Sequence, residues 1–121
     1  MMNYQISQTF FFDAAHTLKR EIEADSSRIH GHTYNAEITL SGQPDPATGM
    51  VLDLGRVRSA IDVLRPQLDH RMLDDVPGLG AATLENLCAF IWRALAPSLP
   101  GLAVVRVWRE GMGDSCTLTA S

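Results

Sequence analysis

The chain has 121 residues, 45% of them hydrophobic and 20% charged, and its formal net charge is −4 at pH 7. This composition supports one hydrophobic core, excludes a largely disordered chain and argues against a general nucleic-acid-binding face, which would be basic. No apolar run has membrane-spanning length, the N-terminus lacks a secretory signal, and Cys88 and Cys116 make no disulfide framework, so we expect one cytoplasmic domain over residues 1–121 with no membrane or nucleic-acid partner.

Two strands are predicted in the first third of the chain. Residues 4–12 are rich in aromatic residues, Thr and Ile, and residues 33–41 alternate apolar with polar side chains. The polar residues 17–29 between them predict a surface loop. Turn-forming residues at 42–49 end the second strand.

Two helices are predicted next. Asp53 can cap a helix whose apolar residues, spaced three and four apart, run from Leu54 to Leu68, and Pro66 should end or kink it. Thr83 can cap a second helix, whose apolar stripe includes Cys88 as a buried small hydrophobe rather than a nucleophile. Strands over 102–110 and 115–120, joined by a hairpin-like turn, follow.

This order of elements predicts an α+β fold. Paired strands at each end of the chain favour an antiparallel four-stranded sheet with both helices on one face. Such a sheet leaves two open edges, and proteins often pair exposed edges. We therefore expect a homo-oligomer in which the strands continue between subunits.

Three of the four histidines lie within seventeen residues of one another. His30 and His32 are two residues apart, so an extended backbone directs both imidazoles to one face, and His16 follows the first strand. Three histidines with an open fourth position are typical of catalytic zinc. The alternative is a set of surface or hydrogen-bonded histidines, and the concentration of so few histidines in one region favours the metal.

A cupin-type metal enzyme is a second alternative, because Glu37 follows His30 and His32 as in part of a cupin motif. On an unbroken strand, however, Glu37 faces away from the two histidines. Two amphipathic helices also do not suit a small all-β barrel. Iron with oxygen-dependent turnover would favour the cupin, and bound zinc would favour the three-histidine site.

Several short segments resemble the 6-pyruvoyl-tetrahydropterin synthase and 6-carboxytetrahydropterin synthase family. They are residues 12–16, 28–34, 49–54, 68–75 and 82–87, followed by Glu110 at the end of a late strand. The resemblance implies the tunnelling fold, in which subunits form a barrel of continued strands, usually a homohexamer built as a dimer of trimers. It implies a zinc-dependent lyase acting on 7,8-dihydroneopterin triphosphate, which yields 6-pyruvoyltetrahydropterin, or 6-carboxytetrahydropterin for queuosine biosynthesis.

The resemblance also assigns site residues. His16, His30 and His32 match the zinc ligands, and Asp69 and His70 match a proton-relay pair. Glu110 matches the carboxylate that binds the guanidine-like edge of the pterin, and Thr83 and Glu85 fall in the segment lining the pterin pocket. From the residues alone, His70 could instead be a histidine favoured by a helix C-terminus, and Glu110 a solvated strand end.

One position departs from the family pattern. Synthases usually carry a catalytic cysteine four residues before the first histidine of the His-Gly-His motif, and here that residue is Ser26. A serine hydroxyl is a much poorer base than a thiolate. Three possibilities follow: a synthase with another base (Glu23, Asp25 or the Asp69–His70 pair), an aldolase-like enzyme that cleaves the dihydroneopterin side chain, or a non-catalytic zinc and pterin binder.

Overall fold

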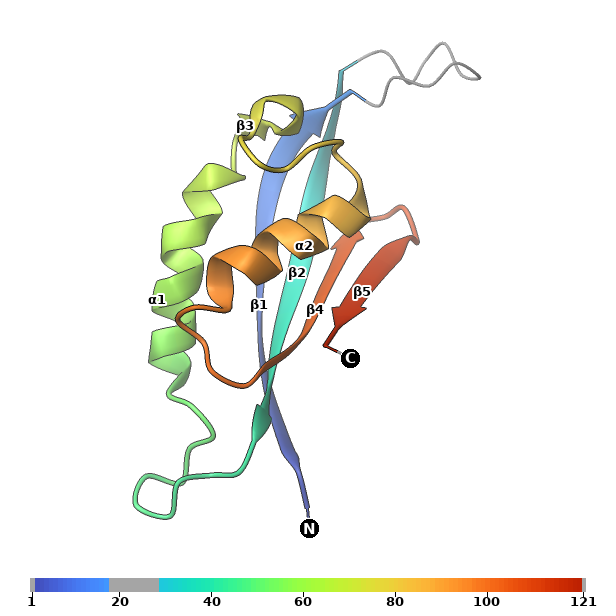
Figure 1. Ribbon diagram of the computed structural model, residues 1–121. Helices are drawn as coiled ribbons and strands as arrows, with labels where there is room; N and C mark the ends of the chain where they lie inside the picture. The colour runs from blue at the N-terminus through green and yellow to red at the C-terminus, as the bar shows by residue number, and fades with distance from the viewer. Residues whose placement is uncertain (1, 18–28, 121) are drawn as a thin grey trace.

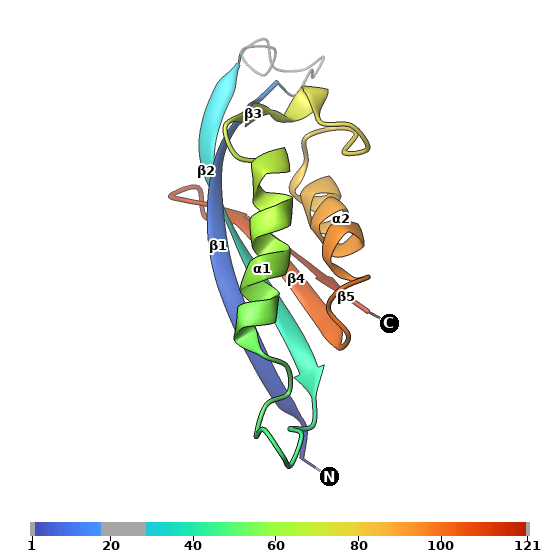
Figure 2. The same cartoon turned by 90° about the vertical axis from the view of Figure 1, so that its left-hand side faces the viewer.

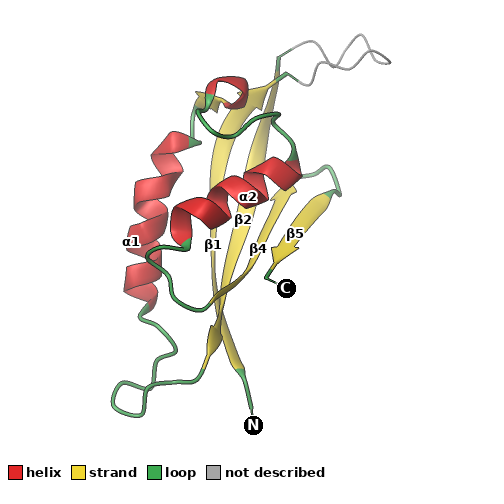
Figure 3. Cartoon of the chain, in the orientation of Figure 1, coloured by secondary structure: helices red, strands yellow, loops and turns green. Residues whose placement is uncertain are grey.

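The computed structural model describes residues 2–17 and 29–120. Figures 1 and 3 show two helices over one face of a curved sheet, and the turned view in Figure 2 shows both helices on the same side of it. The elements, in chain order, are β1 (Tyr4–His16), β2 (His30–Gly42), α1 (Leu54–Leu64), β3 (Arg71–Met72), α2 (Leu84–Leu95), β4 (Leu102–Arg109) and β5 (Ser115–Thr119), with 3₁₀ turns at Arg65–Gln67 and Leu73–Asp75.

The sheet has five strands in the order β3-β1-β2-β4-β5. Strands β1 and β2 pair antiparallel from Tyr4 opposite Gly42 to His16 opposite His30, and β2, β4 and β5 continue the antiparallel pairing. The α+β prediction with both helices on one face is therefore confirmed. Residues 18–28, which contain the predicted loop and Ser26, Glu23 and Asp25, lie outside the described part of the chain.

The prediction of four antiparallel strands is wrong, because β3 pairs parallel with β1 at Ala14 and Ala15. A two-residue strand has no alternating pattern for a sequence to display. Its position comes from tertiary contacts: the His70 backbone N–H donates to the Asp13 carbonyl at 2.7 Å. The continuation of strands between subunits stays a prediction.

One face of the sheet carries the core. Phe12 and Tyr34 stack there with ring centroids 5.1 Å apart, and alternate residues along β2 and β4 pack against the helices. The fully buried apolar residues of this face and of the helices include Phe12, Tyr34, Ala36, Ile38, Leu40, Val57, Leu87, Cys88, Ile91, Val105 and Val107. His16, His30 and His32 have the same parity along β1 and β2, so they extend this face toward the end where β2 begins.

Both helix starts agree with the sequence. The Asp53 side chain accepts the Gly55 N–H at 2.8 Å, and Thr83 Oγ1 accepts the Asn86 N–H at 3.1 Å. Helix α1 ends at Leu64, and Pro66 lies in the following 3₁₀ turn, as its missing N–H predicts. Strand β1 continues to His16 and β2 begins at His30, so the three histidines lie within strands rather than beside them.

Candidate metal and substrate site

The strand pairing assembles three histidines at one end of the sheet. His16, the last residue of β1, lies opposite His30, the first residue of β2, and His32 lies opposite Ala14. The ring centroids of His16 and His32 are 5.0 Å apart, those of His16 and His30 6.3 Å, and those of His30 and His32 6.4 Å. Two strands thus bring three imidazoles together on one face at this end of the sheet, and we call them the histidine triad.

His16 supplies the test of whether a metal fits. His16 is only 3% exposed, and neither Nδ1 nor Nε2 of its ring has a hydrogen-bond partner among the described residues. Buried polar atoms without partners are rare and costly, and each calls for an explanation. Three imidazoles on a tetrahedral zinc, with Zn–N of about 2.0–2.1 Å, have ring centroids about 5 Å apart. The spacing in the triad matches this value for His16 and His32 and is wider for the two pairs that include His30, so the His30 ring would have to move closer for all three to hold one zinc.

The surroundings keep two triad members neutral. Burial lowers the pKa of His16, with a further contribution from His32. Burial also lowers the pKa of His32, and the positive charge of Arg109 adds to the effect. A neutral imidazole offers the lone pair that a metal needs. Near neutral pH, both rings are therefore available as ligands without first losing a proton.

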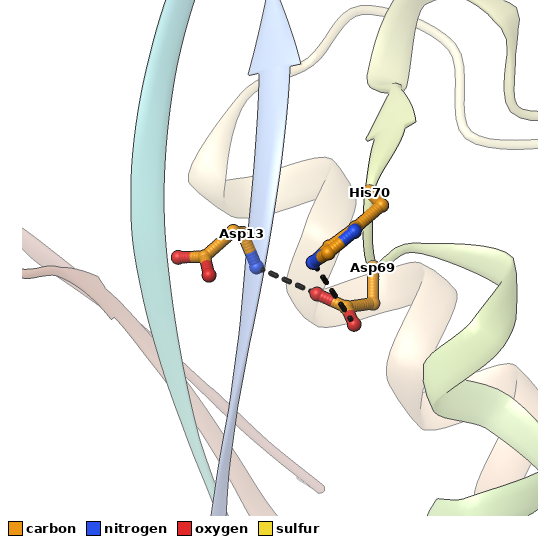
Figure 4. Close-up of side chains that lie close together, drawn as sticks. All are labelled: Asp13, Asp69 and His70. Carbon is orange, nitrogen blue, oxygen red and sulfur yellow. Dashed lines mark hydrogen bonds and ion pairs between the residues drawn. The ribbon is translucent and has the colours of Figure 1, made fainter.

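Asp69 and His70 form a second cluster at the edge of the sheet (Figure 4). Asp69 Oδ1 accepts the backbone N–H of Asp13 at 2.9 Å, and Asp69 Oδ2 lies 3.7 Å from His70 Nε2. Arg65 Nη2 lies 3.3 Å from the same Oδ2. Among the described residues, His70 is the one non-glycine with positive φ, at 58°. A carboxylate fixed by two other elements thus faces an imidazole, and a movement of about 0.5 Å would bring the two into the hydrogen-bond range of a proton relay.

The same cluster is also a possible metal site. Asp13, Asp69 and His70 each offer a ligand atom within 4.8 Å of the others. Most of their oxygens already have partners: Asp13 Oδ1 accepts the Thr33 hydroxyl at 2.5 Å, and Asp69 is bound by Asp13 and Arg65. The His70 side chain is 78% exposed. A cluster with satisfied acceptors has less need of a cation than the triad, where the buried His16 nitrogens have no partner in the described part of the chain.

The triad and the relay pair lie on different faces of β1. Asp13, whose backbone binds Asp69 and His70, has the opposite parity to His16. Even so, His32 and His70 both line a cavity of about 560 Å³ at this edge of the sheet. The structure therefore brings the triad together, brings Asp69 and His70 together, and places the two groups beside one cavity.

The predicted pterin-pocket residues are divided between two places. Thr83 and Glu85 line a smaller cavity of about 260 Å³ together with Tyr34, Arg109 and Asp114. Glu110 does not: its N–H donates to the Thr33 carbonyl at 2.9 Å, and its Oε2 accepts the Asn35 side-chain amide at 2.7 Å. Asn35 neighbours Tyr34 on β2, so its side chain lies on the opposite face of the sheet. The structure thus separates Glu110 from Thr83 and Glu85.

Sequence reasoning missed Arg109 and Asp114. Arg109 lies opposite Tyr34 in the β2–β4 register, on the face of the triad. Its Nε lies 3.3 Å from Asp114 Oδ1, and its Nη2 binds Asp114 Oδ2. Alternation along β4 would have placed Arg109 on the face of Val105 and Val107. The turn that returns Asp114 to it has no comparable sequence signal.

Comparisons with known proteins give these features a family. The model of the family described as 6-pyruvoyl tetrahydropterin synthase matches residues 5–121. The 6-pyruvoyl tetrahydrobiopterin synthase of Homo sapiens is 34% identical over 112 residues, covering 79% of this chain and 77% of the human one. The 6-carboxy-5,6,7,8-tetrahydropterin synthase of Synechocystis is 32% identical over 121 residues, covering 95% of this chain and 89% of the Synechocystis one.

Two further relatives bear on fold and reaction. The dihydroneopterin monophosphate aldolase of Pyrococcus furiosus is 32% identical over 90 residues, covering 74% of this chain and 73% of the aldolase. The structure of the Caenorhabditis elegans 6-pyruvoyl tetrahydropterin synthase is similar to this one with a TM-score of 0.85 and 26% sequence identity. The match covers 100% of this chain and 98% of the nematode chain. Among the described residues, no helix is long and apolar enough to cross a membrane. The family match and the shared α+β fold together show that this chain belongs to the 6-pyruvoyl tetrahydropterin synthase family.

Proposed function

We propose that the protein is a zinc-dependent pterin lyase of the synthase type, acting on 7,8-dihydroneopterin triphosphate. The observation that carries the proposal is buried His16, whose two ring nitrogens lack partners among the residues that the structure describes, while two more imidazoles lie near it on β2. His16, His30 and His32 would hold the zinc. Family membership supplies the pterin substrate, since the human and Synechocystis relatives are tetrahydropterin synthases.

The residues of the site have separable tasks. Zinc bound at the triad would act as a Lewis acid toward the hydroxyls of the substrate side chain. Asp69 accepts the Asp13 N–H and faces His70 Nε2, so it would favour the tautomer with its proton on Nε2 and leave Nδ1 to take a proton from the substrate or return one. The His70 side chain is 78% exposed, which leaves it open to a substrate that enters the adjoining cavity.

An aldolase reaction is the second candidate. The Pyrococcus furiosus relative is named as a dihydroneopterin monophosphate aldolase, and Ser26 replaces the usual synthase cysteine. An enzyme without a thiolate near the side chain would rely on Asp69 and His70, or on Glu23 or Asp25, for proton transfer. A zinc and pterin binder without turnover is the remaining alternative.

We also propose that the chain, as one domain, works as a cytoplasmic homohexamer that serves queuosine or a related pathway. The sheet edges support the oligomeric part of this proposal. Strand β3 contributes only two residues at one edge, and β5 forms the other edge with alternating exposure. Exposed edges are commonly paired or covered in natural proteins, and pairing of β1 and β5 between subunits would extend the sheet into a barrel.

Product analysis tests the proposed function. Zinc-loaded protein is incubated with 7,8-dihydroneopterin triphosphate, and the products are identified by mass spectrometry, with His30→Ala as the control for metal dependence. We expect zinc-dependent loss of triphosphate with a 6-carboxy or 6-pyruvoyl product. Side-chain cleavage with the phosphate retained would instead establish the aldolase, and unchanged substrate that stays bound would leave a binding role.

A further inference from the structure

We propose that Asp74 is a positioning residue for His16, because its carboxylate fixes the chain immediately after this buried member of the histidine triad. The inference rests on the proposed zinc site and extends it to a residue that is not itself a ligand. Asp74 belongs neither to the relay pair nor to the linings of the two cavities described above, so its contacts need an account of their own.

Both carboxylate oxygens of Asp74 bind the residue that follows His16. Asp74 Oδ1 accepts the backbone N–H of Thr17 at 2.9 Å, and Asp74 Oδ2 accepts the Thr17 hydroxyl at 2.6 Å. The two residues are 57 positions apart in the sequence, so this is a tertiary contact and not a local turn. A carboxylate that binds one residue at two points fixes its backbone and its side chain together, which a single hydrogen bond would not do.

The turn that carries Asp74 is anchored in the core. Asp74 lies in the 3₁₀ turn Leu73–Asp75, which follows β3 and lies beside the end of β1 (Figures 1 and 2). Leu73 is fully buried in the hydrophobic core, and its carbonyl accepts the Val76 N–H at 3.1 Å. The strand before the turn, β3, pairs with β1. Asp74 therefore connects a well-packed turn to the last part of β1.

His16 depends on support of this kind. It is the last residue of β1 and pairs with the first residue of β2, and the ends of elements open more readily than their middles. The ring nitrogens of His16 have no hydrogen-bond partner among the described residues, so no hydrogen bond of the ring holds it in place. The position of His16 is thus set by the chain on either side, which means β1 before it and Thr17 after it.

A ligand that is already held in place binds a metal more tightly. Fixing a group near its bound position removes part of the ordering cost of binding, and loss of a partner that orients a metal ligand costs about 10–100-fold in metal affinity. Asp74 holds His16 through the backbone rather than through the ring, so we expect an effect near the lower end of that range. The negative charge of Asp74 could also attract a cation, and the contact and the charge therefore need separate variants.

Zinc titration of the metal-free protein, in competition with a chromogenic chelator, tests the assignment. Asp74→Ala removes the contact and the charge. Asp74→Asn removes only the charge, because its amide can accept the Thr17 N–H and donate to the Thr17 hydroxyl. We expect Asp74→Ala to raise the zinc Kd about tenfold and Asp74→Asn to stay within about twofold of the wild type. Asp75→Ala is the matched control, since it removes another exposed carboxylate from the same turn, and its zinc Kd should equal that of the wild type.

The outcomes separate the positioning role from the proposed function. A zinc Kd in Asp74→Asn as high as that in Asp74→Ala would assign the effect to the charge and overturn the positioning role. An equal rise in Asp75→Ala, or a wild-type Kd in Asp74→Ala, would overturn it as well. In all three cases the wild type still binds zinc, so the proposed function is unaffected, whereas a wild type that binds no zinc overturns both.

Urea denaturation of each metal-free variant identifies a folding defect. If Asp74→Ala is unfolded, Thr17→Val provides the test, because it removes the hydroxyl contact and keeps the backbone N–H. We expect the zinc Kd of Thr17→Val to rise about threefold, as loss of one hydrogen bond implies. A zinc Kd equal to that of the wild type would then overturn the positioning role of Asp74.

Discussion

Replacing His16 with leucine should stabilise the metal-free protein and abolish its stabilisation by zinc. His16 is 3% exposed, and its two ring nitrogens have no partner among the described residues. An unsatisfied buried polar group costs about 1–3 kcal/mol, whereas an apolar group of similar size in its place can be neutral or stabilising. With two such atoms, we expect His16→Leu to raise the free energy of unfolding of the metal-free protein by about 2 kcal/mol.

Urea denaturation in the presence of a chelator measures this effect. With an m-value of about 2 kcal/mol/M, the midpoint of His16→Leu should lie about 1 M above that of the wild type. Zinc should then raise the wild-type midpoint by mass action, because it binds the folded state, and leave His16→Leu unmoved. His70→Asn is the control: it removes a histidine outside the triad with a residue that tolerates positive φ, and its response to zinc should match that of the wild type.

The opposite order of stabilities would contradict the role assigned to His16. If metal-free His16→Leu unfolds at lower urea than the metal-free wild type, the His16 nitrogens have partners in solution. His16 would then give no support for a metal at the triad. If zinc stabilises His16→Leu as much as the wild type, the metal binds elsewhere.

Three other predictions concern the relay, a helix cap and a thiol. Asp69→Asn should lower turnover by about a hundredfold or more, as expected for general acid–base catalysis, with zinc content unchanged; an effect below threefold in steady-state kinetics would remove Asp69 from the mechanism. Thr83→Ala removes the cap of α2 and should cost about 1 kcal/mol in urea denaturation, whereas no loss would mean that the α2 N-terminus is satisfied otherwise. Burial raises the pKa of the Cys88 thiol to about 12, so Cys88 should stay unlabelled by a thiol reagent at pH 8 in folded protein and react in urea. The stability that its neutral form contributes should be lost as the pH rises from about 9 toward 12, and rapid labelling of Cys88 in folded protein at pH 8 would contradict the burial.

The histidine triad could be predicted from sequence because its signal is local. His30 and His32 share a face on any extended backbone, and His16 ends the neighbouring strand. The caps at Asp53 and Thr83 and the break at Pro66 are local in the same sense. Each depends on a few residues close in the chain, so reading them requires no knowledge of the fold.

The missing parts of the site depend on distant pairings. Strand β3 exists because the His70 N–H reaches the Asp13 carbonyl, and Arg65 contacts Asp69 while its Nε donates to the Phe11 carbonyl at 2.7 Å. Whether Arg109 or Glu110 faces Tyr34 is decided by the register of β4 on β2, where a shift of one residue exchanges the two faces. The register places Arg109 on the face of Tyr34.

The zinc content of dialysed protein, measured by elemental mass spectrometry, decides whether the histidine triad binds a metal. The wild type, His32→Ala and Asp69→Asn are compared, because His32 belongs to the triad and Asp69 to the other cluster that offers metal ligands. We expect one zinc per chain in the wild type and in Asp69→Asn, and none in His32→Ala. Zinc retained in His32→Ala and lost in Asp69→Asn would place the metal at Asp13, Asp69 and His70 and contradict this expectation.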